Sequence, residues 1–177
     1  MAVHAQRARG PAAVTLTVAL LLASFGCTSR RGGGDTGGVL ISTSLPLPSY
    51  AQAGSHGSAD KGAKFFFPQL EIYDESGNLV YSSHESIENA RVLKELPDGI
   101  QGLRPKPDAP RLAEVMEAVP ALRARKGEIL GQHRVCILSI FLENCHACAV
   151  QEDALGDAEH RLLDHGINLL VLRVSRP

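Results

Sequence analysis

The sequence predicts an α/β domain, because two strongly apolar segments near the carboxyl terminus flank a segment with helical periodicity, and a hairpin pattern precedes them. Residues 135–142 and 167–174 are almost continuously apolar, as is typical of strands buried on both faces of a sheet. Between them, apolar residues recur at helical spacing, and Gly166 can end the helix. These apolar positions are Ala147, Val150, Ala154, Leu155, Ala158 and Leu162. Strand, helix and strand form a βαβ unit, which implies parallel strands and a right-handed crossover.

The first 26 residues have the pattern of an export signal. Two arginines precede an apolar segment at 12–23, which is too short to span a bilayer. Residues 22–27 overlap the end of this segment and resemble a bacterial lipobox. At this motif a diacylglycerol is attached to a cysteine, and the chain is cut just before that cysteine. The small residues before Cys27 fit, whereas the family prefers leucine at the position of Ser24. The other interpretation is an ordinary secretory signal followed by an incidental cysteine.

A lipid on Cys27 implies an envelope protein that is anchored to a membrane and faces the periplasm. Acyl chains add about 0.8 kcal/mol of membrane affinity per buried CH₂ group. Thr28 follows the cysteine, and the family's sorting rule then favours the outer membrane where the host has one. The compartment is oxidising, so disulfides form and persist there.

Residues 28–64 are rich in Gly, Ser, Thr and Pro, which predicts a flexible tether between Cys27 and the folded domain. Only residues 39–41 form an apolar run, and so short a run buries too little surface to offset the entropy of ordering the chain. The ordered domain is therefore expected to span residues 65–177.

The first half of this domain predicts a hairpin and short helices. Residues 70–73 and 79–81 alternate in polarity around a turn-rich stretch, which favours a β-hairpin. Ser86 is expected to cap a short helix that runs through Leu96 and is ended by a Pro-Asp-Gly sequence. Residues 112–122 show helical spacing, and Pro120 should kink or divide that helix.

The net charge of the chain argues against one class of binding partner. The chain has 18 basic and 19 acidic residues, and cleavage after residue 26 removes Arg7 and Arg9, which leaves a net charge of about −3. This is not the basic surface of a nucleic-acid-binding protein, so no nucleic acid is expected as a partner.

Besides Cys27, the cysteines are Cys136, Cys145 and Cys148. An odd number in an exported domain leaves one thiol free or ligand-bound if the other two pair.

The strongest chemical signal is Cys145-x-x-Cys148, placed between the first apolar strand and the following helix. Unpaired N–H groups and the dipole at a helix start stabilise a thiolate, which lowers the pKa of a cysteine there. Cys145 can be exposed while Cys148 lies one turn deeper. Cys145 is expected to attack a substrate disulfide and Cys148 to resolve the mixed disulfide, with His146 adding a positive charge or a hydrogen bond.

This segment, from Ile137 to Leu155 with Phe141 four residues before the first cysteine, resembles the active-site region of the thioredoxin superfamily. It is most similar to the membrane-anchored thiol–disulfide oxidoreductases of the TlpA type, in which an acidic residue such as Glu152 commonly follows on the helix. The resemblance covers about 40 of the 177 residues. It implies a thioredoxin-like α/β fold, catalysis by Cys145 and Cys148, protein thiols or disulfides as partners, and no cofactor or metal.

Several features depart from that family. Ser139 stands where thioredoxin has a buried aspartate used in proton transfer, and Asn144 where the family usually has tryptophan. Only 29 residues follow Cys148, whereas a complete thioredoxin fold continues with a helix, two strands and a final helix. The family's cis-proline, which faces the disulfide and grips the substrate, belongs to that missing part. The fold is therefore either truncated after the βαβ unit, or the hairpin at 70–81 completes the sheet from the other side, and the second alternative is our hypothesis.

Two non-enzymatic interpretations remain, and each would make the chain a structural envelope lipoprotein. The first is an inert disulfide between the two cysteines of the motif. The second is a zinc or copper(I) site, for which the available ligands are His133, Cys136, Cys145, His146 and Cys148. However, the second half of a zinc pattern is missing, and His133 and Cys136 are expected at the far end of the sheet. Cys136 is itself expected to be a buried core thiol.

Overall fold

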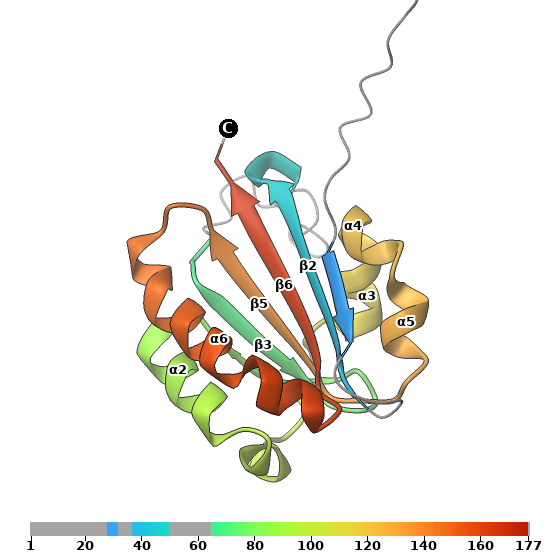
Figure 1. Ribbon diagram of the computed structural model, residues 1–177. Helices are drawn as coiled ribbons and strands as arrows, with labels where there is room; N and C mark the ends of the chain where they lie inside the picture. The colour runs from blue at the N-terminus through green and yellow to red at the C-terminus, as the bar shows by residue number, and fades with distance from the viewer. Residues whose placement is uncertain (1–27, 32–36, 50–64, 177) are drawn as a thin grey trace, which may run out of the picture.

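The computed structural model describes residues 28–31, 37–49 and 65–176, which form a mixed six-stranded sheet with helices on both faces (Figure 1). The strand order is β1-β2-β6-β5-β3-β4. The strands are β1 (Thr28–Arg31), β2 (Val39–Pro46), β3 (Gln69–Tyr73), β4 (Leu79–Ser83), β5 (Cys136–Leu142) and β6 (Asn168–Ser175). The predicted signal at residues 1–26 and the predicted lipid site, Cys27, lie outside the described residues.

The predicted βαβ unit is confirmed. β5 and β6 pair in parallel, from Cys136 opposite Asn168 to Leu142 opposite Val174, and α6 (Ala149–Asp164) connects them. All of β5 except its last residue is buried, as expected of a strand covered on both faces. Gly166 ends the helix with a φ of +75°, a left-handed conformation that glycine adopts without steric cost.

The predicted hairpin is also confirmed, and it completes the sheet. β3 and β4 pair antiparallel, and β3 also pairs antiparallel with β5, with Gln69 opposite Ile140. In the turn, the Asp74 carboxylate accepts hydrogen bonds from the backbone N–H groups of Ser76 and Asn78, both at 2.9 Å. Gly77 has a φ of +76°, so the turn needs glycine there.

The structure differs from the expected tether at residues 28–64, because β1 and β2 lie within this range. β2 pairs in parallel with β6 over seven residue pairs, and β1 pairs antiparallel with β2 at the sheet edge. Alternate side chains of β2 are buried, among them Val39 at 2% exposure and Ile41 at 0%. The domain therefore begins before residue 65. Burial of the alternate β2 side chains, which are Val39, Ile41, Thr43 and Leu45, offsets the ordering entropy. Residues 50–64 lie outside the described part of the chain.

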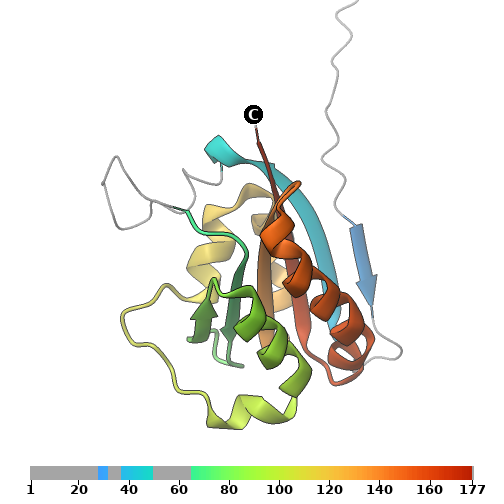
Figure 2. The ribbon, with the colours of Figure 1, turned by 90° about the vertical axis from the view of Figure 1, so that its left-hand side faces the viewer.

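Helices cover the two faces of the sheet and create two apolar cores (Figures 1 and 2). The remaining helices are α2 (Ser86–Glu95), η1 (Asp98–Gly102), α3 (Leu112–Ala118), α4 (Pro120–Arg123) and α5 (Lys126–Leu130). α2 and α6 pack side by side on one face, and α3, α4 and α5 gather on the other. Pro120 begins α4 and so divides the predicted helix at the expected residue. Among the described residues, none of the helices has the length and hydrophobicity needed to cross a bilayer.

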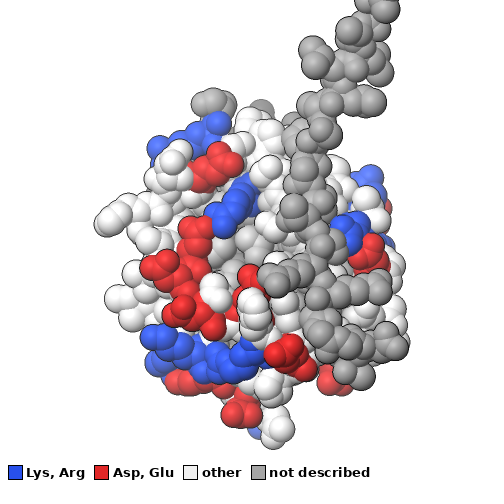
Figure 3. Space-filling model, in the orientation of Figure 1, with Lys and Arg blue, Asp and Glu red and all other residues white. Residues whose placement is uncertain are grey.

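The outer surface of α2 and α6 is charged, and acidic and basic side chains lie beside one another on it (Figure 3). Arg91 and Glu95 of α2 form one such pair, with 2.8 Å between Nη1 and Oε1. Both partners are more than half exposed, so the pair contributes little to stability. The polar outer faces match the apolar inner stripes of these two helices.

One end of the sheet collects several chain segments, and we call it the cysteine end. β5 finishes there and β3, which is antiparallel to it, starts there. β4 runs parallel to β5, so the helices that follow these strands, α2 and α6, both begin at this end. The Phe67–Pro68 peptide bond directly before β3 is cis. Cys145 and Cys148 lie between β5 and α6, so these segments surround the motif.

Candidate redox site

Cys145 and Cys148 are joined as a disulfide at the cysteine end. The S–S distance is 2.16 Å and the Cα atoms are 5.3 Å apart. The 3-10 turn η2 (His146–Cys148) leads directly into α6, so the second cysteine immediately precedes the helix. Asn144 has a φ of +58°, a left-handed conformation that asparagine adopts more readily than most residues, and it turns the chain before the motif.

The two sulfur-bearing residues differ in exposure in the sense that the sequence predicts. Cys145 is half-buried, whereas Cys148 is 1% exposed and belongs to the core beneath α6. His146 is exposed on the η2 turn between them. The structure thus brings together the three residues predicted to carry the chemistry, with the first cysteine as the one that a partner can approach.

An arginine that sequence reasoning missed lies beside this motif. Arg173 of β6 stands opposite Phe141 in the β5–β6 register, and its Cζ atom is 5.6 Å from the centre of the phenyl ring. Its guanidinium also forms an ion pair with Glu152, one turn beyond Cys148 in α6. Both charged side chains are about two-fifths exposed, so the ion pair contributes at most about 1 kcal/mol. Only the strand register, which the sequence does not reveal, places Arg173 here.

The amide of Gln151 is the second feature that sequence reasoning missed. Gln151 is 0% exposed and lies one turn after Cys148, whereas Val150, expected on the buried stripe, is 48% exposed. The helix is therefore rotated by one residue from the predicted stripe in its first turn. A glutamine next to a buried helical stripe was the available signal, but glutamine is usually a surface residue, so its sequence position alone does not indicate burial.

The other predicted metal ligands do not join the motif. Cys136 begins β5 at the opposite end of the sheet and is 0% exposed, and burial raises the pKa of its thiol far above the usual range. It is therefore a core thiol that stays protonated, as expected. His133 lies just before it, at the same far end. Within the described ranges, no three His, Cys, Asp or Glu side chains cluster closely enough to hold a metal ion.

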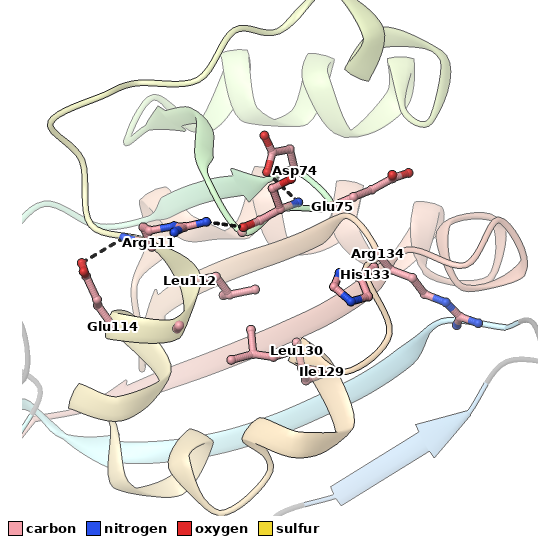
Figure 4. A pocket seen from close by; sticks show the side chains of 12 residues that line it. Asp74, Glu75, Arg111, Leu112, Glu114, Ile129, Leu130, His133 and Arg134 are labelled. Atoms are coloured by element: carbon pink, nitrogen blue, oxygen red, sulfur yellow. Dashed lines mark hydrogen bonds between the residues drawn. The ribbon is translucent and has the colours of Figure 1, made fainter.

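A pocket of about 570 Å³ lies at that opposite end of the sheet, and its polar groups are largely occupied by internal contacts (Figure 4). Arg111 Nη2 donates a hydrogen bond to the carbonyl oxygen of Ser76 at 2.8 Å. Glu114 Oε2 accepts one from the Arg111 backbone N–H at 3.1 Å, and Asp74 bonds within its own turn. The pocket therefore does not compete with the cysteine pair as the candidate site.

Glu71 of β3 gives a pH-dependent prediction. Burial raises the pKa of this carboxyl above its usual value, while hydrogen bonds from Tyr73 and Gln69 and the charge of Lys106 partly offset the rise. The folded protein therefore binds more protons than the unfolded chain between pH 4.5 and the raised pKa, so stability should fall as pH increases through this interval. Urea unfolding at pH 5 and pH 8 should show a smaller loss for Glu71→Gln than for the native chain. An equal loss in both proteins would contradict this assignment.

No family model matches the chain, and neither a curated protein nor a solved structure matches it.

Proposed function

We propose that this protein is a lipid-anchored thiol–disulfide oxidoreductase of the cell envelope, with Cys145 and Cys148 as its redox pair. The observation that carries the proposal is the placement of this pair. A disulfide of two nearby cysteines closes directly before a 16-residue helix and directly after a buried strand, with one cysteine accessible and the other enclosed. Such helix starts favour the thiolate that the chemistry needs.

The exchange proceeds in two steps with a net transfer of two electrons. In the reduced protein, the Cys145 thiolate attacks one sulfur of a partner disulfide, forms a mixed disulfide and releases the first partner thiolate. The Cys148 thiol then loses its proton and attacks the Cys145 sulfur. This step closes the 145–148 disulfide and releases the second partner thiolate, so the partner is reduced and the protein oxidised. Run in reverse, the same steps oxidise a partner. His146, exposed beside Cys145, can stabilise the attacking thiolate.

The sheet supports a likeness to the thioredoxin family in which chain order is rearranged. After its βαβ unit, the family continues with a helix, two strands and a final helix. Here β3, β4 and α2, which come earlier in the chain, occupy the sheet beside β5 and the face beside α6. Pro68, whose bond to Phe67 is cis, directly precedes β3 at the cysteine end. Pro68 thus lies at the cysteine end of the sheet, whereas no proline follows the motif until Pro177.

The same proposal includes the membrane anchor. A lipid on Cys27 would hold the domain at the periplasmic face of a membrane, which is the outer one where the host has two. β1 begins at the next residue, Thr28, and pairs with β2. The anchor is then attached close to the edge of the sheet, and protein partners would meet the cysteine pair near the membrane surface.

A redox titration tests the function. The mature chain, residues 27–177 with Cys27→Ser to remove the lipid site and Cys136→Ala to remove the third thiol, is equilibrated with dithiothreitol or glutathione buffers. Alkylation and mass measurement then count reduced cysteines. A reversible two-thiol transition between roughly −120 and −270 mV would support exchange. A pair that resists reduction down to about −300 mV would instead be a structural disulfide, and thiols protected until a chelator is added would indicate metal binding.

A further inference from the structure

A fully buried glutamine lies in the first part of the helix that carries the cysteine motif. Gln151 is 0% exposed and follows Cys148 by one turn. Farther along, α6 buries apolar side chains, so an amide interrupts an otherwise apolar contact with the sheet. Burying an amide is unfavourable unless its donors and acceptor are paired. The partners of Gln151 therefore determine what the residue does.

Each polar atom of the Gln151 side chain has a partner on a different element. Nε2 donates to Ser139 Oγ of β5 at 2.8 Å and to the carbonyl oxygen of Gln69, the first residue of β3, at 3.1 Å. Oε1 accepts from Asn89 Nδ2 of α2 at 2.5 Å. Both donor hydrogens and the acceptor are used. One side chain thus connects α6 to β5, β3 and α2.

Asn89 completes the hydrogen-bond network and determines the orientation of both side-chain amides. Its Nδ2 also donates to the carbonyl oxygen of Ser83 at 3.2 Å, and its Oδ1 accepts from the Tyr81 hydroxyl at 2.8 Å. Turning the Gln151 amide over would set its donor against the Asn89 donor, and turning the Asn89 amide over would set its oxygen against the acceptor oxygens of Gln151 and Ser83. Only one arrangement therefore satisfies all of these groups. Burial raises the pKa of Tyr81, which therefore stays neutral, and no member of the network carries a charge.

These bonds join the two parts of the chain that carry the two sulfurs. Cys145 is held by β5, because it follows that strand by three residues, and Cys148 is held by the first turn of α6. The bond from Gln151 to Ser139 ties that turn directly to β5. The closing step of exchange needs the two cysteines at their observed Cα separation of 5.3 Å. The hydrogen bond between Gln151 and Ser139 therefore acts on the separation of the two cysteines, on which closure of the disulfide depends.

We propose that Gln151 is a positioning residue for the cysteine pair, an inference that rests on the proposed thiol–disulfide exchange. In the reduced protein its amide holds Cys148 within reach of the Cys145 sulfur and so raises the effective concentration of the resolving thiol. Removing the amide should leave both cysteines in place but make the disulfide easier to reduce. A purely structural glutamine would affect unfolding and not the disulfide equilibrium.

The test compares Gln151→Leu with Arg161→Met in the mature chain with Cys27→Ser. Arg161 also ties α6 to α2, through hydrogen bonds to the carbonyl oxygens of Leu93 and Lys94, but more than two turns farther along the helix. The equilibrium constant for disulfide formation is measured against glutathione, and stability by urea unfolding. Gln151→Leu should lower that constant about tenfold, which corresponds to a reduction potential about 30 mV less negative. Arg161→Met should lose stability with the constant unchanged.

The outcomes separate this inference from the proposed function. If the native pair shows no reversible transition, both fail. If the native pair is reversible and Gln151→Leu has the native constant, or if both variants shift it equally, only the positioning role is wrong. Where Gln151→Leu does not fold, Ser139→Ala removes a single bond of the network and should lower the constant by about threefold. An unchanged constant in Ser139→Ala would then contradict the proposal.

Discussion

Cys148→Ser should trap a covalent complex with a disulfide partner, whereas Cys145→Ser should form none. The accessible Cys145 sulfur can still attack when Cys148 is serine, but no thiol remains to resolve the mixed disulfide. In Cys145→Ser the remaining thiol is 1% exposed, so a partner disulfide cannot approach it without local opening of the helix start. We expect the two remaining thiols to differ roughly tenfold or more in their rate of alkylation.

The measurement uses glutathione disulfide and a scrambled protein disulfide as probes, with adducts counted by mass after acid quenching. Cys136→Ala is the matched control, because this thiol is buried at the far end of the sheet and should not alter exchange. Equal adduct formation by Cys145→Ser and Cys148→Ser would show that the assigned roles of attacking and resolving thiol are wrong. Loss of folding in both serine variants would instead favour a structural disulfide.

The features that local sequence determines were predictable. The βαβ unit follows from two apolar runs around a helical pattern, and the β3–β4 hairpin from alternation around Asp74 to Asn78, because each pattern depends on neighbours in the chain. The location of Cys145 and Cys148 at a helix start follows from the same local evidence. Their unequal exposure was expected as well, because Cys145 lies in extended backbone before the helical turn, whereas Cys148 lies at the helix start and packs into the core.

The features that depend on tertiary contacts were not predictable from one sequence. Arg173 reaches Phe141 only through the β5–β6 register, and Gln151 meets Ser139 and Asn89 only after α6 and α2 pack together. The alternative of a truncated fold arose because the family's chain order was assumed. β3 and β4, from earlier in the chain, extend the sheet beside β5, and periodicity carries no information on which strand lies beside which.

β2 was missed for a different reason, and the error has a practical consequence. Val39, Ile41 and Leu45 are buried, but Ser42, Thr43 and Ser44 interrupt the apolar residues and glycine-rich sequence precedes the strand. Averaged over the segment, this composition resembles a linker. The strand is stabilised by pairing with β6, which lies more than 120 residues away in the chain. A fragment designed from composition alone would begin at residue 65 and omit it.

Deleting residues 28–64 should therefore abolish the cooperative fold. The deletion removes the three buried apolar side chains of β2, which together contribute roughly 6 kcal/mol. That is comparable to the whole stability of a small domain, about 5–15 kcal/mol. It also leaves β6 as an unpaired apolar edge. Circular dichroism during urea titration should show a broad, non-cooperative change for residues 65–177 and a sigmoidal one for residues 27–177.

A point variant tests the same contact without shortening the chain. Gly38 directly precedes β2, and a Cβ atom there would lie 2.0 Å from the carbonyl oxygen of Ile167, a backbone atom at the start of β6. Gly38→Ala must therefore push β2 away from its partner and should cost about 3 kcal/mol. Gly156→Ala is the matched control: no atom lies within 4 Å of the added methyl on α6, so it should gain about 0.5–1 kcal/mol. If residues 65–177 unfold as cooperatively as the longer chain and Gly38→Ala is neutral, β2 is not part of the stable sheet. If both are destabilised while Gly156→Ala is not, the strand is required, and the cysteine pair has to be studied in a chain that retains it.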